Sequence, residues 1–189
     1  TLVVSDNAST DGTWGLLQDF AARDRRIRLV RNDQNIGASG NYRRVLDEAS
    51  TPYFKWASSN DLCAPTLLDA CAGTLDRRAD VIVAAPRAVM FEDDPGNGTP
   101  YRHGLNLEDP DPVARFIGAL RIQRNVAMNG VVRTEAVRRT RGILPYAGSD
   151  CVMIAALALQ GLVVEVPEDL LFIRNTPNTA TARMSREEV

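Results

Sequence analysis

Two aspartates follow apolar segments of this chain, at positions where carboxylates commonly do chemistry. Asp6 comes just after the apolar run Leu2–Val4, and Asp61 follows the run Tyr53–Ala57 after a short polar stretch. Ligands of open α/β sheets bind beyond the carboxyl ends of the strands, so we expect these two side chains to meet there. A carboxylate accepts hydrogen bonds from a nucleobase or a ribose hydroxyl, or it binds a divalent cation. The alternative is that both aspartates are ordinary turn residues.

Strands and helices are expected to alternate through the first 85 residues and to position these aspartates. Apolar residues recur at helical spacing in the segments between the runs, as Tyr42, Val45 and Leu46 do. This alternation predicts an α/β domain with a parallel, doubly wound sheet. Strands are expected over Leu2–Val4, Ile27–Val30, Tyr53–Ala57 and Val81–Ala85. The first and the last of these runs have the character of strands covered on both faces.

The pattern changes after Pro86. Residues 92–112 are rich in Asp, Pro, Gly and Asn, which predicts a long surface loop, and His103 within it is assigned no role. An apolar helix is expected after Gly148-Ser149-Asp150, followed by two closing strands over Leu162–Val166 and Leu170–Arg174. The polar tail 176–189 is predicted to be mobile. We expect all 189 residues to form a single domain.

Composition excludes several classes of protein. The net charge of −2 gives no indication of a nucleic-acid-binding surface. The three cysteines lack CxxC spacing, which argues against a zinc site or a disulfide framework and favours a reducing compartment. No apolar run approaches the roughly 20 residues that a membrane-spanning helix needs. A cytoplasmic protein is the simplest interpretation.

Four blocks of the sequence, in this order, resemble glycosyltransferase family 2, which has the GT-A fold. The blocks are VVSDNASTDGT, VRNDQNIGASGNYRRVLDEA, YFKWASSNDLCAP and YAGSDCVMIAALALQG. The resemblance implies a GT-A-like mixed, mostly parallel sheet flanked by helices, with a nucleotide-sugar-binding half at 1–85 and an acceptor-side half at 86–175. Members of the family normally begin one strand and one helix earlier, so the chain is expected to be N-terminally truncated.

The resemblance also implies a donor site for a nucleoside-diphosphate sugar. Asp6 matches the family's base-contacting aspartate. Arg174 lies where many relatives have a histidine, and its planar guanidinium suits a diphosphate. The residues expected at the donor nucleotide are Asp6, Asn7, Ser59, Asn60, Trp56 and Arg174.

The metal and the catalytic base follow from the same resemblance. The family's DxD motif, which binds Mg²⁺ or Mn²⁺, matches Ser59-Asn60-Asp61, so Asp61 is the expected metal ligand and Ser59 replaces the first aspartate. The loss of one carboxylate predicts a lower metal affinity. Asp150 matches the family's general base, which removes the proton of the acceptor hydroxyl. Its alternative role is to cap the helix that follows.

The sequence therefore predicts an inverting glycosyltransferase, with a noncatalytic nucleotide- or carbohydrate-binding descendant of the fold as the alternative. The expected partners are a nucleotide sugar and a saccharide or lipid-linked acceptor, as in polysaccharide biosynthesis, and no nucleic acid. Arg138, Arg139 and Arg141 form a basic cluster. The cluster suggests either a peripheral contact with the inner face of a membrane or a solvated helix face.

Overall fold

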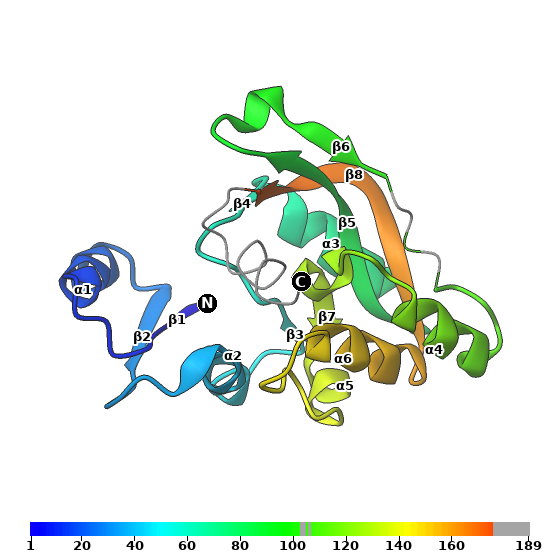
Figure 1. The fold of residues 1–189 in the computed structure, drawn as a ribbon, viewed down its shortest axis with the longest axis horizontal. Helices are drawn as coiled ribbons and strands as arrows, with labels where there is room; N and C mark the ends of the chain where they lie inside the picture. The colour runs from blue at the N-terminus through cyan, green and yellow to red at the C-terminus, as the bar shows by residue number, and fades with distance from the viewer. Residues whose placement is uncertain (103–104, 106, 176–189) are drawn as a thin grey trace, which may run out of the picture.

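Two sheets and the helices around them make up the structure, a computed structural model that describes residues 1–102, 105 and 107–175 (Figure 1). His103, which was assigned no role, and the tail 176–189, which was predicted to be mobile, lie outside the described residues. The strands are β1 (Leu2–Asp6), β2 (Ile27–Arg31), β3 (Tyr53–Phe54), β4 (Leu62–Cys63), β5 (Val81–Phe91), β6 (Thr99–Tyr101), β7 (Val131–Arg133) and β8 (Leu162–Arg174).

The helices lie around these sheets. They are α1 (Thr13–Arg23), α2 (Gly37–Asp47), α3 (Leu67–Arg77), α4 (Pro112–Leu120), α5 (Thr134–Arg138) and α6 (Ser149–Ala158), with 3₁₀ turns η1 (Pro95–Asn97) and η2 (Val126–Asn129). Within the described ranges, no helix has the length and apolar character needed to cross a membrane.

The small sheet pairs β1 with β2 in parallel, and its register places Asp6 opposite Arg31. The larger sheet has the order β3-β7-β5-β8-β4, with β6 added to β5. In that sheet β5 and β8 are parallel, whereas β3, β4, β6 and β7 pair in antiparallel fashion. The α/β class and the mixed sheet are confirmed. Fewer pairings are parallel than strand–helix alternation suggested, because the short strands outside the regular βαβ pattern run against their neighbours.

The two closing strands predicted at the end of the domain are one strand, β8, which runs along the whole length of β5. The ladder shifts register around Pro86 and Arg87, opposite the polar segment Pro167–Asp169. Proline cannot donate to a ladder and is tolerated where a bulge interrupts the pairing. The polar segment, which suggested a break between two strands, is therefore a local irregularity within β8.

Apolar side chains pack on both faces of β5. On one face, Val81 and Ala84 pack with α3, which contributes Leu67 and Cys71. On the other face, a second core cluster gathers side chains from α2, α4, α5 and α6. A strand covered on both faces explains the continuous apolar sequence of Val81–Ala85.

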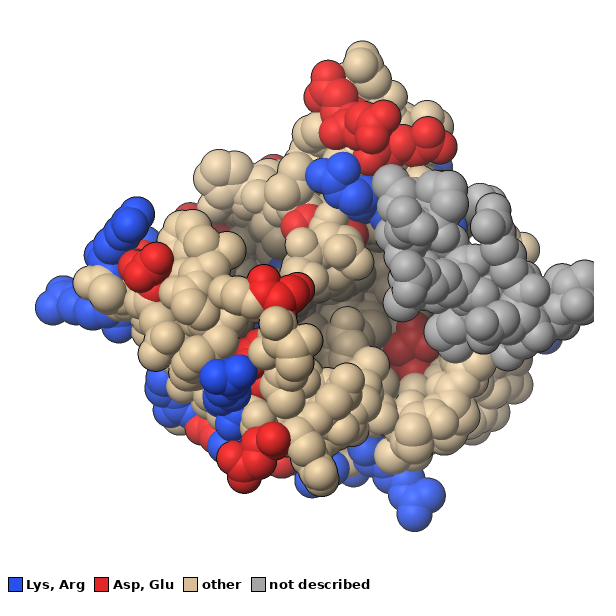
Figure 2. Space-filling model, turned by 60° about the vertical axis from the view of Figure 1, so that its left-hand side comes forward, with Lys and Arg blue, Asp and Glu red and all other residues tan. Residues whose placement is uncertain are grey.

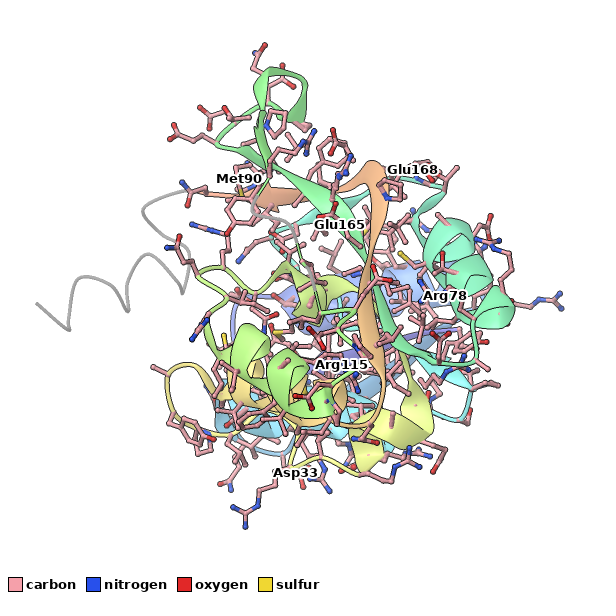
Figure 3. All side chains as sticks on the ribbon, turned by 90° about the vertical axis from the view of Figure 1, so that its right-hand side faces the viewer. Asp33, Arg78, Met90, Arg115, Glu165 and Glu168 are labelled. Carbon is pink, nitrogen blue, oxygen red and sulfur yellow. The ribbon has the colours of Figure 1, made fainter. Side chains whose placement is uncertain are left out.

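Arg115 joins α4 to the end of α6. Its side chain is only 7% exposed, and its guanidinium donates to the carbonyl oxygens of Ala158, Asp109 and Pro110 at 2.8, 2.6 and 3.2 Å (Figure 3). The last carbonyls of a helix lack partners within the helix, so a cation at this end satisfies them and interacts favourably with the helix dipole. This contact fixes α4 against α6 and so helps to hold the helix that carries Asp150 in its first turn.

We predict that Arg115→Met lowers the free energy of unfolding by about 2–3 kcal/mol, because buried carbonyl oxygens lose their donor. For a chain of this size that corresponds to a fall in melting temperature of about 4–12 °C, measured by circular dichroism. Arg121→Met, at the exposed end of the same helix, is the control and should change stability by less than about 0.5 kcal/mol. Equal effects of the two substitutions would contradict this role for Arg115.

Candidate functional site

Asp6 ends β1 and is almost fully buried, with 3% of the residue exposed. Its Oδ2 atom forms an ion pair with Arg31 Nε at 3.1 Å and accepts a hydrogen bond from the backbone N–H of Ser9 at 3.3 Å. Its Oδ1 atom is buried and has no hydrogen-bond partner within the described structure. A buried, unpaired carboxylate oxygen is costly, and it is a ready acceptor for a donor group on a ligand.

A network of amide side chains surrounds the end of β1. Asn7 donates to Asn35 Oδ1 at 2.8 Å and to the carbonyl oxygen of Gly37 at 3.3 Å. Its own Oδ1 accepts from Asn32 and from the backbone N–H of Ile36, both at 3.0 Å. All polar atoms of the Asn7 side chain are thus used within the chain. The side chain thus positions the loop before α2, and its contact with the donor stays a prediction.

Asn41 attaches α2 to the small sheet. Its Oδ1 accepts from Ser5 Oγ at 2.6 Å and from Asn32 Nδ2 at 2.9 Å, and its Nδ2 donates to the carbonyl oxygen of Ser5 at 3.1 Å. Ser5 directly precedes Asp6, so this network fixes the backbone that presents the Asp6 carboxylate.

Asp61 lies in the loop between β3 and β4 and is half-buried. Its Oδ1 accepts from the backbone N–H of Arg174, at the end of β8, at 3.1 Å. Burial raises the pKa of the Asp61 carboxyl above its usual range, and the Arg174 hydrogen bond with the positive charges of Lys55 and Arg174 offsets part of that rise. The burial of Lys55 in turn lowers the pKa of its ammonium group.

Asp150 lies in the first turn of α6, where Gly148 is the N-cap residue with φ of 77° and no side chain caps the helix. The alternative capping role for Asp150 is therefore not the one seen. Its Oδ2 instead accepts from Asn125 Nδ2 at 3.0 Å, while Asn125 Oδ1 accepts from the backbone N–H of Met128. Asn125, which sequence reasoning missed, holds the carboxylate in place.

The pKa of the Tyr42 phenol is influenced by both Asp61 and Asp150. Burial raises this pKa, and the negative charges of Asp61 and Asp150 raise it further. The charges of both carboxylates thus act on this side chain. We call Tyr42, Asp61, Asp150 and Arg174 the central cluster.

Trp56 belongs to the core rather than to a donor pocket. It is 4% exposed, its indole N–H donates to the carbonyl oxygen of Tyr42 at 3.1 Å, and its ring meets Phe54 edge to face. Its contact with the nucleotide stays a prediction, made for a side chain that is packed in the core. The indole supports Tyr42.

The remaining predicted donor residues lie near Asp61. Ser59 and Asn60 are exposed in the same loop. The Arg174 guanidinium stacks on the ring of Phe91, 4.7 Å from its centroid, and donates to the carbonyl oxygen of Glu92 at 3.0 Å. Figure 2 shows that the face turned to the viewer is hollowed, with acidic surface recessed in the hollow.

The structure brings only some of the predicted site residues together. The central cluster unites Asp61, Asp150 and Arg174, whereas Asp6 belongs to the small sheet and contacts none of them directly. The link between the two groups is α2: Asn41 is hydrogen-bonded to Ser5 beside Asp6, and the next residue, Tyr42, is influenced by the charges of Asp61 and Asp150.

A family model identifies the chain. The model described as glycosyl transferase family 2 matches residues 1–140. The chain belongs to glycosyl transferase family 2. Among curated proteins it is similar to EpsE of Bacillus subtilis (strain 168), named as a glycosyltransferase, with 27% identity over 147 residues that cover 69% of this chain and 53% of EpsE.

Solved structures share the fold of this family 2 chain. Residues 1–349 of Staphylococcus aureus TarS match with a TM-score of 0.70 and 14% identity over 91% of this chain and 50% of that one. The mannosyltransferase PcManGT from Pyrobaculum calidifontis, solved with GDP-Man and Mn²⁺, matches with a TM-score of 0.65 and 16% identity over 98% and 50%. The GT-A fold is confirmed. The chain spans about half the length of these relatives.

We predict that Asp61→Asn stabilises the folded chain at pH 7.5 by less than about 1 kcal/mol, because half exposure screens the charge. The raised pKa means that the folded state loses stability as the pH rises from the ordinary value of 3.8 through the raised one, and the loss persists above it. An uncharged amide removes this loss and keeps the acceptor for Arg174.

Denaturant unfolding at pH 7.5 and at pH 3.5 checks the prediction, since the gain should vanish at the lower pH. Asp33→Asn, which removes one negative charge from an exposed position, is the matched control (Figure 3). A gain of equal size in both variants would show that net charge alone is responsible.

Proposed function

We propose that the chain carries the donor site and catalytic base of an inverting glycosyltransferase, which moves a sugar from a nucleoside diphosphate to an acceptor hydroxyl. The observation that carries the proposal is the arrangement around α2. A buried carboxylate with an unpaired oxygen lies on one side, and a cluster containing Asp61, Asp150 and Arg174 lies on the other. The relatives solved with UDP-GlcNAc and with GDP-Man support a nucleotide-sugar donor.

The donor would lie across α2, with its base at Asp6 and its diphosphate at Asp61. Asp6 Oδ1 accepts a ring N–H of the base. The backbone N–H of Arg174 is hydrogen-bonded to Asp61, and we propose that its guanidinium, which now donates to the carbonyl oxygen of Glu92, turns toward a phosphate beside Asp61. Ser59 and Asn60 offer exposed polar groups in the same loop.

A divalent cation fits this site only with the help of the donor. Among the described residues, no group of three or more His, Cys, Asp or Glu side chains is placed to hold a metal. Asp61 has one carboxylate oxygen engaged by Arg174 and the other available. Mg²⁺ often binds through one or two carboxylates with water and substrate phosphates, so Asp61 would hold a Mg²⁺ or Mn²⁺ that also contacts the diphosphate. Such an ion would neutralise charge on the leaving group.

Asp150 acts as the general base in the proposed transfer. Its carboxylate takes the proton of the acceptor hydroxyl while the acceptor oxygen forms a bond to the anomeric carbon. The bond from that carbon to the phosphate oxygen breaks, and the nucleoside diphosphate leaves with the electron pair. Asn125 keeps the carboxylate turned toward the cluster, as a general base must lie within hydrogen-bond reach of its substrate.

The acceptor is proposed to be a saccharide or a lipid-linked saccharide, in the cytoplasm. The predicted basic cluster gives a lipid-linked acceptor at a membrane little support. Arg138 pairs with Glu135 and with the carbonyl oxygen of Ala49, and Arg139 donates to Gln160. Two of the three arginines are thus engaged within the chain, which favours the solvated helix face over a membrane contact.

The second candidate function is a nucleotide-binding module without turnover, which Ser59 in the place of a carboxylate favours. Asp150→Asn separates the two. An enzyme should lose turnover by about 10²–10³-fold, because the proton acceptor is gone, and keep its donor affinity within about twofold. Donor hydrolysis and transfer across a panel of nucleotide sugars, with calorimetric donor binding, measure both quantities.

Asp69→Asn provides the matched control for that experiment. Asp69 also lies in the first turn of a helix, α3, outside the proposed site. Unchanged turnover in Asp150→Asn would overturn the assignment of the base. A wild-type chain that binds donor and never turns over would favour the binding module.

We also predict that Mn²⁺ tightens UDP or GDP binding to the wild-type chain by about 3–30-fold relative to EDTA, a modest effect because Asp61 is the one carboxylate beside the diphosphate. Asp61→Asn should abolish the Mn²⁺ effect and retain the affinity measured in EDTA. Isothermal titration calorimetry at pH 7.5 measures these affinities. A wild-type affinity that does not respond to Mn²⁺ would exclude the proposed metal role.

A further inference from the structure

The two oxygens of Asp6 are in different states. Oδ2 forms an ion pair with Arg31 and accepts a hydrogen bond from Ser9, whereas the buried Oδ1 has no hydrogen-bond partner in the described structure. The carboxylate therefore offers a ligand one acceptor rather than two. Oδ1 is covered here, so a base that reaches it must displace a neighbouring side chain.

Arg31 is held firmly in the position that occupies Oδ2. It lies opposite Asp6 in the parallel β1–β2 register. Its Nη2 atom donates to the carbonyl oxygen of Ser9 at 3.2 Å, and its guanidinium lies 5.0 Å from the ring centroid of Trp14. These contacts fix both the side chain and the loop that follows β1.

Ala8 in that loop has φ of 60°, in a left-handed region that costs a non-glycine residue free energy. The Ser9 N–H reaches Asp6 Oδ2 only because the chain takes this turn. A strained turn beside an unpaired buried acceptor is typical of a binding site whose shape is set in advance.

We infer that this single free oxygen makes the site select a uracil or thymine base over guanine, and that Arg31 is the residue that sets the preference. The inference rests on the proposed function, because it assumes that a nucleotide base meets Asp6. It adds the class of donor, UDP or dTDP sugars, and a specificity residue that the sequence did not indicate.

The expected base preference follows from the hydrogen-bonding edges of the bases. Uracil and thymine present one ring N–H between two carbonyl groups, so one acceptor satisfies them. Guanine presents N1–H and N2–H side by side, a pair that suits both oxygens of a carboxylate. With Oδ2 taken by Arg31, guanine would bury an N–H without a partner, which is penalised. Adenine and cytosine would place a ring nitrogen lone pair near the carboxylate.

Calorimetric titration of the wild-type chain with UDP, dTDP, GDP, ADP and CDP in Mn²⁺ tests the inference. UDP or dTDP should bind at least about 10-fold more tightly than GDP, the effect of one unsatisfied hydrogen bond to a charged group. Arg31→Met frees Oδ2 for a second N–H, and should lower the ratio of UDP to GDP affinity to below about 3. Arg31→Gln, which still offers one donor, should give an intermediate ratio.

Arg28→Met is the matched control. Arg28 lies in the same strand and is similarly exposed. It pairs with Glu48, the residue that follows α2. It should keep the wild-type preference, and thermal unfolding shows whether each variant is folded. If the Arg31→Met chain does not fold, the wild-type preference and Arg31→Gln still decide the question.

The outcomes separate this inference from the proposed function. Wild-type binding of GDP as tightly as UDP, or a preference that survives Arg31→Met, would overturn the inference and leave the donor site standing. No binding of any nucleoside diphosphate would overturn the proposed function itself.

Discussion

The site depends on one helix that joins two sheets without a common strand. Asn41 of α2 binds the backbone and side chain of Ser5 beside Asp6, and Tyr42 accepts the indole N–H of Trp56 and faces the charges of Asp61 and Asp150. Consecutive residues of a helix point about 100° apart, so neighbours in sequence serve opposite sides. Because no strand pairing in the described structure links β1 and β2 to the larger sheet, α2 determines how the two halves of the site face each other.

The hydrogen-bond pairing of polar groups differs between the site and the rest of the described structure. The buried Arg115 and the half-buried Arg133 each donate to three backbone carbonyl oxygens, so their burial costs little and fixes neighbouring elements. Asp6 keeps one oxygen unpaired, Asp61 is held in a setting that disfavours its charge, and Ala8 has a strained backbone. These unfavourable features gather where a ligand would relieve them, as expected when function opposes stability locally.

Local rules predicted most elements and singled out Asp6 and Asp61, whereas Asp150 was singled out by the family resemblance. Apolar runs mark covered strands, and acidic residues after them mark a ligand edge. Sequence reasoning missed partners that come from distant residues. Asn7 looked free because its partners Asn32 and Asn35 lie 25 and 28 positions away, and Trp56 looked like a pocket wall because its acceptor is the backbone of Tyr42. The sequence did not show that β8 is one strand, because only the register of β8 with β5 shows that a polar segment can remain in the ladder.

The three aspartates lie on different kinds of element, and these elements constrain their carboxylates to different degrees. Asp6 lies in a paired strand opposite Arg31, with both side chains fixed by further contacts. Asp150 lies in a helical first turn and is held through one side chain, Asn125. Asp61 lies in a loop and is tied by one hydrogen bond to the end of β8. The most rigid carboxylate is thus the one proposed to distinguish bases, where a fixed pattern of acceptors is required. The least constrained is the one proposed to face a diphosphate, where charge matters more than direction.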